Sequence, residues 1–135
     1  MIFNYDVSDL NTAISDLTDY THNVSTAKIA TNDTTNISDG QITGTISGNL
    51  LEISGQVKAA ADVGAWLQTI CTMQTETRPS TGRTVWAYAT YDNTPQFINL
   101  ELLSDGTLRT RMTSSPGHKI NANTWIVIPN QIVFT

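Results

Sequence analysis

Aromatic rings and planar polar groups are the side chains from which saccharide sites are built. An aromatic ring stacks on the apolar face of a sugar, and amide, carboxylate and guanidinium groups hydrogen-bond its hydroxyls. The middle and the C-terminal part of this 135-residue chain offer both kinds of group. The residues that we predict to bind saccharide are Trp86, Tyr91, Asp92, Asn93, Arg111 and His118.

Burial in the core is the competing interpretation for the tryptophans Trp66, Trp86 and Trp125, because an indole in a strand usually packs inside. Residues 84–91 read TVWAYATY, so Trp86 and Tyr88 share one face and small apolar residues share the other. The sequence leaves open whether this aromatic face is core or a binding platform. For His118, in a polar loop, simple solvation is the alternative to ligand binding.

Motifs for catalysis and metal binding are absent from the sequence. It contains no HExxH, GxSxG, P-loop or GxGxxG pattern, and its acidic residues are isolated in predicted turns and surfaces. Cys71 is the one cysteine, so neither a disulfide nor a cysteine metal site is expected. We therefore predict no catalytic residue, metal or cofactor. A glycan-cleaving enzyme remains an alternative that needs two carboxylates, or a nucleophile and a base, in one cleft.

The charge of −5 is concentrated at the N-terminus. Residues 1–39 contain six Asp and only Lys28, whereas residues 40–135 contain six acidic and six basic residues. Without a basic cluster, nucleic-acid binding is not expected. No apolar run is long enough for a membrane span, and no signal peptide is visible. Charged residues make up only 14%, and 22 Thr, 10 Ser and 11 Asn supply the polar surface instead.

A heptad pattern near the N-terminus predicts a helical neck over residues 1–30. Asp6 is a plausible N-cap for this helix. A narrow a/d stripe suits a partner helix, so we predict an oligomerisation seam; an amphipathic helix packed on its own domain is the alternative. The a and d positions of this seam are Val7, Leu10, Ile14, Leu17, Thr21 and Val24.

After a polar segment at 31–40, predicted as a linker, the pattern changes to period 2. Short alternating segments separated by turn signals run through residues 41–135. This pattern predicts an all-β, antiparallel β-sandwich or barrel head domain. Pro129 is expected to divide the last segment into two strands or to lie at an edge.

The register of one hairpin can be predicted from charge. A three-residue loop at 104–106 pairs Leu102 with Leu108 on one face of the hairpin. On the other face it pairs Glu101 with Arg109 and Asn99 with Arg111. This register separates apolar from polar residues and places Gly106 at the left-handed position that such loops require.

The order of neck, linker and β domain resembles the C-terminal head domains of tailed-phage receptor-binding proteins and tail-fibre tips, especially those of siphophages of Gram-positive bacteria. The elements that carry this resemblance are GQV at 55–57, TRP at 77–79, VWA at 85–87 and the hairpin at 99–108. The resemblance covers roughly residues 40–135.

The resemblance implies a homotrimer of β heads on a short helical neck at the tail tip of a virion, made in the host cytoplasm. Its partners would be a host cell-wall or surface polysaccharide and, through the N-terminal segment, other tail or baseplate proteins. The implied function is adhesion without catalysis. A structural tail or baseplate component of the same fold, without a glycan site, is the alternative; it predicts buried aromatic residues.

Overall fold

The computed structural model describes residues 26–135, and these form an all-β, antiparallel, nearly closed barrel. The six heptad positions of the predicted neck, from Val7 to Val24, lie outside the described residues. No helix within residues 26–135 is long and apolar enough to cross a membrane.

The barrel contains eleven strands and one short 3-10 helix, η1. The long strands alternate buried and exposed residues, as expected for a sheet with one face on a core. The bounds are β1 Lys28–Ile29, β2 Thr31–Asn32, β3 Ile37–Ser47, β4 Leu50–Ala59, β5 Val63–Gly64, β6 Trp66–Thr72, η1 Thr75–Thr77, β7 Arg83–Tyr91, β8 Thr94–Leu102, β9 Thr107–Arg111, β10 Lys119–Ile120 and β11 Trp125–Phe134.

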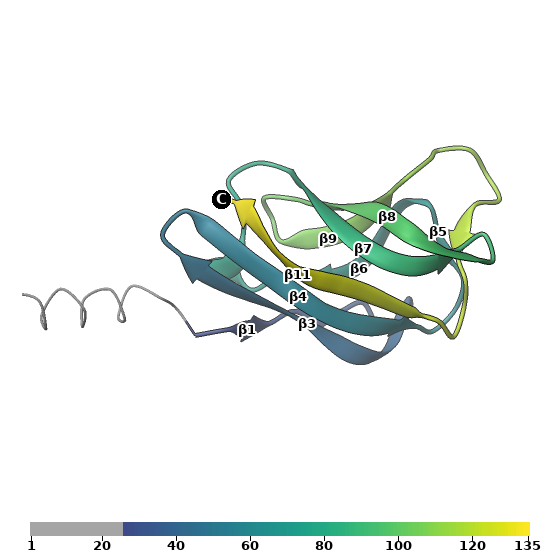
Figure 1. The fold of residues 1–135 in the computed structure, drawn as a ribbon, viewed down its shortest axis with the longest axis horizontal. Helices are drawn as coiled ribbons and strands as arrows, with labels where there is room; N and C mark the ends of the chain where they lie inside the picture. Colours follow the sequence, from purple (N-terminus) through teal and green to yellow (C-terminus); the bar gives the residue numbers. More distant parts are fainter. Residues whose placement is uncertain (1–25) are drawn as a thin grey trace, which may run out of the picture.

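The strand order is β1-β3-β4-β11-β7-β8-β9-β6-β2, and the short β10 pairs with β5 and β7. Figure 1 shows β3, β4 and β11 running side by side along one wall, with β7, β8 and β9 on the other side, so the sheet curls around a central core. The interior is filled by aliphatic side chains, and Ile42, Ile53, Ile70, Leu100 and Ile126 are among those with almost no exposed surface. The barrel is therefore a packed core without a lumen.

Residues 28–32 close the barrel by changing partner in the middle. Strand β1 pairs with β3, and β2, two residues later, pairs with β6 at the other end of the sheet. The buried Ala30 lies at the change, and its N–H donates to the carbonyl of Ile42 at 2.8 Å. One five-residue segment thus joins the first and last long strands of the sheet.

The predicted linker at 31–40 is wrong, as is the assignment of residues 28–30 to the neck. Residues 31–40 contain β2, a turn and the beginning of β3. The Asp33 carboxylate accepts the backbone N–H groups of Thr35 and Asn36, both at 3.0 Å, which forms the turn. Strands of two residues have no detectable periodicity, so the polar composition concealed them.

The predicted register of the β8–β9 hairpin is confirmed. Leu102 pairs with Leu108 and Glu101 with Arg109. Gly106 has the expected positive φ of 91°. Asp105 accepts the Thr107 N–H at 2.9 Å, which stabilises the turn.

Gly55 provides a test of the packing between β3 and β4. Its φ is +135°, and an added Cβ would lie 2.3 Å from the carbonyl oxygen of Gln41. Gly48 also has a positive φ, of +60°, but an added Cβ there would meet nothing within 4 Å. Both substitutions therefore strain the backbone, and only Gly55→Ala also forces two strands apart.

We expect Gly48→Ala to lower the free energy of unfolding by about 1 kcal/mol and Gly55→Ala to lower it by about 3 kcal/mol or more. Urea unfolding of both variants and the wild type measures the difference. Equal losses for the two variants would contradict the close approach of β3 and β4 at this position.

Candidate functional site

Four side chains form a row across the outer face of strands β7, β8, β9 and β6. Trp86 on β7 pairs with Asn99 on β8, and Arg111 on β9 pairs with Trp66 on β6. Leu100 pairs with Thr110, so Asn99, just before Leu100, and Arg111, just after Thr110, lie opposite each other. Both side chains are on the outer face of the sheet. We call these four residues the tryptophan row. It places an indole at each end and an amide and a guanidinium between them.

Both indoles of the tryptophan row are accessible. Trp86 is 54% exposed and Trp66 is 41% exposed, whereas Val85 and Ala87 on the opposite face of β7 are buried. The aromatic face that the sequence left undecided is therefore on the surface of the chain. Two large exposed aromatic side chains on one face make this surface a candidate for contact with another molecule.

A side-chain amide fixes the position of Trp86. Pro129 has no N–H for the sheet, and β11 remains one strand with a bulge between Ile128 and Gln131. The Gln131 side chain replaces the missing pairing: its Oε1 accepts the Trp86 N–H at 2.9 Å and its Nε2 donates to the Trp86 carbonyl at 2.8 Å. The prediction that Pro129 divides the segment or lies at an edge is therefore wrong, since β11 is one strand between β4 and β7 and a bulge accommodates the proline.

Glu101 holds two arginines beside the row. Its Oε1 accepts hydrogen bonds from Arg109 Nε at 2.9 Å and Nη2 at 2.7 Å, and its Oε2 accepts one from Arg111 Nη1. Partial burial opposes ionisation of this carboxyl, but the bonds from Arg111 and Arg109 outweigh it and lower the pKa of Glu101. The Arg111 guanidinium also lies 5.8 Å from the centre of the Trp66 ring, within cation–π range.

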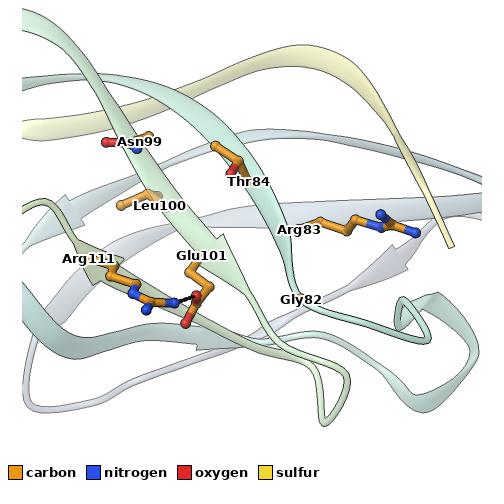
Figure 2. A pocket seen from close by; sticks show the side chains of 7 residues that line it. All are labelled: Gly82, Arg83, Thr84, Asn99, Leu100, Glu101 and Arg111. Atoms are coloured by element: carbon orange, nitrogen blue, oxygen red, sulfur yellow. Dashed lines mark hydrogen bonds and ion pairs between the residues drawn. The ribbon is translucent and has the colours of Figure 1, made fainter.

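An open groove of about 480 Å³ adjoins the row on the side of Glu101. Figure 2 shows Arg111 reaching toward Glu101, with Thr84 and Asn99 further along the groove and Arg83 pointing away from this pair. The groove offers hydroxyl, amide, carboxylate and guanidinium groups to a ligand. Its lining residues are Gly82, Arg83, Thr84, Asn99, Leu100, Glu101 and Arg111.

A second group of predicted residues lies at the β7–β8 turn; we call Tyr91, Asp92, Asn93 and His118 the turn cluster. Nδ1 of His118 lies 2.6 Å from Oδ2 of Asp92. The His118 ring is stacked on Tyr91, with 6.2 Å between the ring centres. Asp92 and Asn93 both have positive φ, as in the tight turns that join two-residue hairpins.

Internal hydrogen bonds occupy the Asp92 carboxylate and the side-chain oxygen of Asn93 in the turn cluster. Besides His118, the Asp92 carboxylate accepts the Lys119 N–H at 3.0 Å, and these two bonds lower the pKa of Asp92. The Asn93 Oδ1 accepts a hydrogen bond from Asn121 Nδ2 at 2.9 Å. These bonds tie the loop before β10 to the β7–β8 turn, so the cluster's evident role is to hold this end of the barrel together.

The structure thus divides the six predicted saccharide-binding residues into two groups. Trp86 and Arg111 belong to the tryptophan row, and Tyr91, Asp92, Asn93 and His118 belong to the turn cluster. Trp66, Asn99 and Glu101 were not among the selected residues. Asn99 and Glu101 could have been found from the predicted hairpin register, which places them opposite Arg111 and Arg109. Trp66 enters the tryptophan row only through the pairing of β6 with β9, which the sequence does not indicate.

No cluster of three or more His, Cys, Asp or Glu residues suited to a metal ion occurs within residues 26–135. Cys71 is buried, and burial raises the pKa of its thiol to about 12, so it is not a reactive thiolate at neutral pH.

No protein-family model matches the chain, and no curated protein matches it.

The Glu101 pairing predicts a pH dependence of stability. Because the folded-state pKa of Glu101 is lowered, its contribution is complete above the ordinary Glu pKa of about 4.3 and disappears as the pH falls through the folded-state value. We expect Glu101→Gln to be less stable than the wild type at pH 7 by about 1 kcal/mol.

Chemical unfolding of both proteins between pH 7 and pH 2 measures this difference, which should shrink below about pH 4. Subtracting the variant's curve removes the contributions of the other carboxyl groups with lowered pKa values, Asp62, Asp92 and Asp105. A difference that stays constant down to pH 2 would show that the charge of Glu101 does not stabilise the fold.

Proposed function

We propose that this protein is a receptor-binding protein of a phage tail, an adhesin whose β-barrel head binds a saccharide on the host cell surface without catalysis. The observation that supports the proposal most is the tryptophan row beside the polar groove. Its two exposed indoles offer apolar surfaces for sugar rings, and Asn99 and Arg111 lie between them to hydrogen-bond hydroxyl groups.

The Arg111 guanidinium and the Trp86 backbone are held in place before a ligand arrives. Glu101 binds Arg111 from one side and the Trp66 ring lies against it on another, so the guanidinium has little freedom to lose on binding. Gln131 fixes the backbone on both sides of the Trp86 side chain. Such preorganisation favours binding by a small number of contacts.

The electrostatics of the site suit a hydroxylated ligand. Arg109 and Arg111 share the single carboxylate of Glu101, so one of their two positive charges is balanced within the protein. The segment 40–135 as a whole carries equal numbers of acidic and basic residues. Sugar hydroxyls act as both donors and acceptors and therefore match this mixture of paired charges, amide and hydroxyl groups.

Oligomerisation belongs to the same proposal. The heads would assemble as a homotrimer through the N-terminal heptad segment and attach through it to other tail or baseplate proteins. Single-site binding to saccharides is commonly weak, and three linked heads would raise the overall affinity through effective concentration.

The second candidate is a structural tail or baseplate protein with the same fold and no glycan site. The exposure of Ile132 and Phe134 on β11, beside a groove of about 220 Å³, favours a protein contact there. This alternative predicts buried aromatic residues, however. The exposure of Trp66, Trp86 and Tyr88 in the chain supports the saccharide-binding proposal instead.

Binding to purified cell-wall polysaccharide from Gram-positive bacteria tests the proposal. We expect Trp86→Ala to weaken binding about tenfold or more, because the ring supplies a stacking surface that no neighbour replaces. Trp125→Ala is the matched control: Trp125 is also partly exposed, at 39%, but packs over Gly40 on another part of the barrel.

Thermal unfolding of both variants must show a folded protein for the comparison to count. Equal loss of binding in the two folded variants would contradict a site at the tryptophan row. Absence of binding by the wild type to every wall polysaccharide tested would contradict saccharide binding altogether.

The oligomeric state provides a separate test. Native mass spectrometry or light scattering of the full chain should give three times the 14.7 kDa subunit mass. Leu10→Asp with Leu17→Asp places charges in the predicted seam and should shift the population toward smaller species. A monomeric wild type at micromolar concentration would contradict the trimer.

A further inference from the structure

Two more exposed aromatic residues continue the outer face beyond the tryptophan row. Tyr88 and Phe97 are cross-strand partners on β7 and β8, one outward position along from Trp86 and Asn99. Phe97 is 65% exposed and Tyr88 is 43% exposed, and their rings meet edge to face with 5.2 Å between centres. Outward positions of a solvated sheet are normally polar, so two exposed aromatic rings at such positions indicate a surface that contacts another molecule.

The core does not account for these rings. The inward residues of this part of β7 and β8 are Val85, Ala87, Ala89, Ile98 and Leu100, all of which are buried. Tyr88 and Phe97 contact each other on the opposite face, and Val127 of β11 is the cross-strand neighbour of Tyr88. The barrel is thus complete without them.

The direction of β7 orders the outer face into steps. Thr84, Trp86 and Tyr88 are successive outward residues, and outward residues on an antiparallel strand are about 6.8 Å apart. This step is comparable with the length of one sugar ring and its linkage. A saccharide chain lying along β7 would therefore meet the polar groove, then Trp86, and then the Tyr88–Phe97 pair.

We propose that this outer face binds an internal stretch of an extended polysaccharide, over at least two consecutive sugar units, and not a single terminal sugar. The groove and Asn99 hydrogen-bond one unit, Trp86 stacks on it, and the Tyr88–Phe97 pair makes apolar contact with the next unit. The proposal rests on the proposed saccharide-binding function and adds the form of the ligand.

The openness of the face supports a chain and not a chain end. Phe97, Trp86 and Tyr88 all project from the middle of a continuous sheet, and each keeps two fifths or more of its surface exposed. A site for a terminal sugar encloses it, whereas a chain that continues in both directions needs a surface without end walls. Added stacking contacts also raise affinity unit by unit, because each contributes a modest amount.

The test uses the full-length protein and wall polysaccharide of Gram-positive bacteria, cleaved and separated by size into fragments of one to eight sugar units. Calorimetric titration of each fraction gives affinity against chain length. We expect affinity to rise about tenfold or more from one unit to three, and then to level off. Tyr88→Ala combined with Phe97→Ala should remove this rise while changing the affinity for the single unit by less than about twofold.

Phe134→Ala is the matched control, because Phe134 on β11 is 64% exposed, nearly the same as Phe97, and lies outside the β7–β8 face. It should retain the dependence on chain length. If the double variant fails to fold, Phe97→Ser alone should lower the three-unit affinity and leave the one-unit affinity unchanged.

The outcomes separate this proposal from the proposed function. Binding that is equal for one unit and for long fragments would overturn the extended site and leave saccharide binding intact. A rise with chain length that survives in both the double variant and Phe97→Ser would also overturn it. Failure of the wild type to bind any fragment or the whole polysaccharide would overturn both proposals.

Discussion

The change of partner at Ala30 is the constraint on which the barrel depends. Strand β1 satisfies the edge of β3 and β2 satisfies the edge of β6, so the two open ends of the sheet are covered by one short segment. The closure has a cost, since the buried Oδ1 of Asn32 has no hydrogen-bond partner among the described residues. The Nδ2 of the same side chain donates to the Gly40 carbonyl at 2.9 Å and ties β2 back to β3. Strand β6 is thereby held between β2, which pairs with Cys71 and Thr72, and β9, whose pairing with Trp66 places that residue at one end of the tryptophan row.

The ion pairs of Glu101 align the arginine side chains on the outer face of the barrel. Glu101 is only partly buried, yet it forms hydrogen bonds with two arginines from the neighbouring strand, which aligns their guanidinium groups across the sheet. Arg111 is thereby placed between the groove and the Trp66 ring. Removing the carboxylate would leave two like charges two residues apart on β9. The same interaction therefore stabilises the hairpin and orients Arg111 beside the groove, which links the stability of the fold to the geometry of the proposed site.

Local sequence patterns predict the fold class and one strand register, but not the closure of the barrel or the composition of the tryptophan row. The antiparallel all-β class followed from period-2 alternation, and the β8–β9 register followed from charge pairing, because both depend on residues close in the chain. The strands of residues 28–32 were missed, because two residues carry no period and their partners, β3 and β6, are distant in sequence. The six predicted binding residues share only their chemical type. They separated into two groups because Trp86 and Tyr91, five residues apart on one strand, lie about 17 Å apart.

The distinction between the two groups follows from how their polar atoms are used. In the turn cluster, Asp92 and Asn93 direct their side chains to His118 and Asn121, so a ligand would have to compete with bonds that already hold the loops. In the tryptophan row the indole faces are open, and Asn99 lies between Trp86 and Arg111 on the surface. Residues predicted for the same chemistry thus have different surroundings. The exposure of the aromatic faces, together with free hydrogen-bonding capacity, distinguishes the face that we propose to bind saccharide from the turn cluster. On this criterion the outer face of β7 and β8 is where a saccharide would gain the most from contact with this protein.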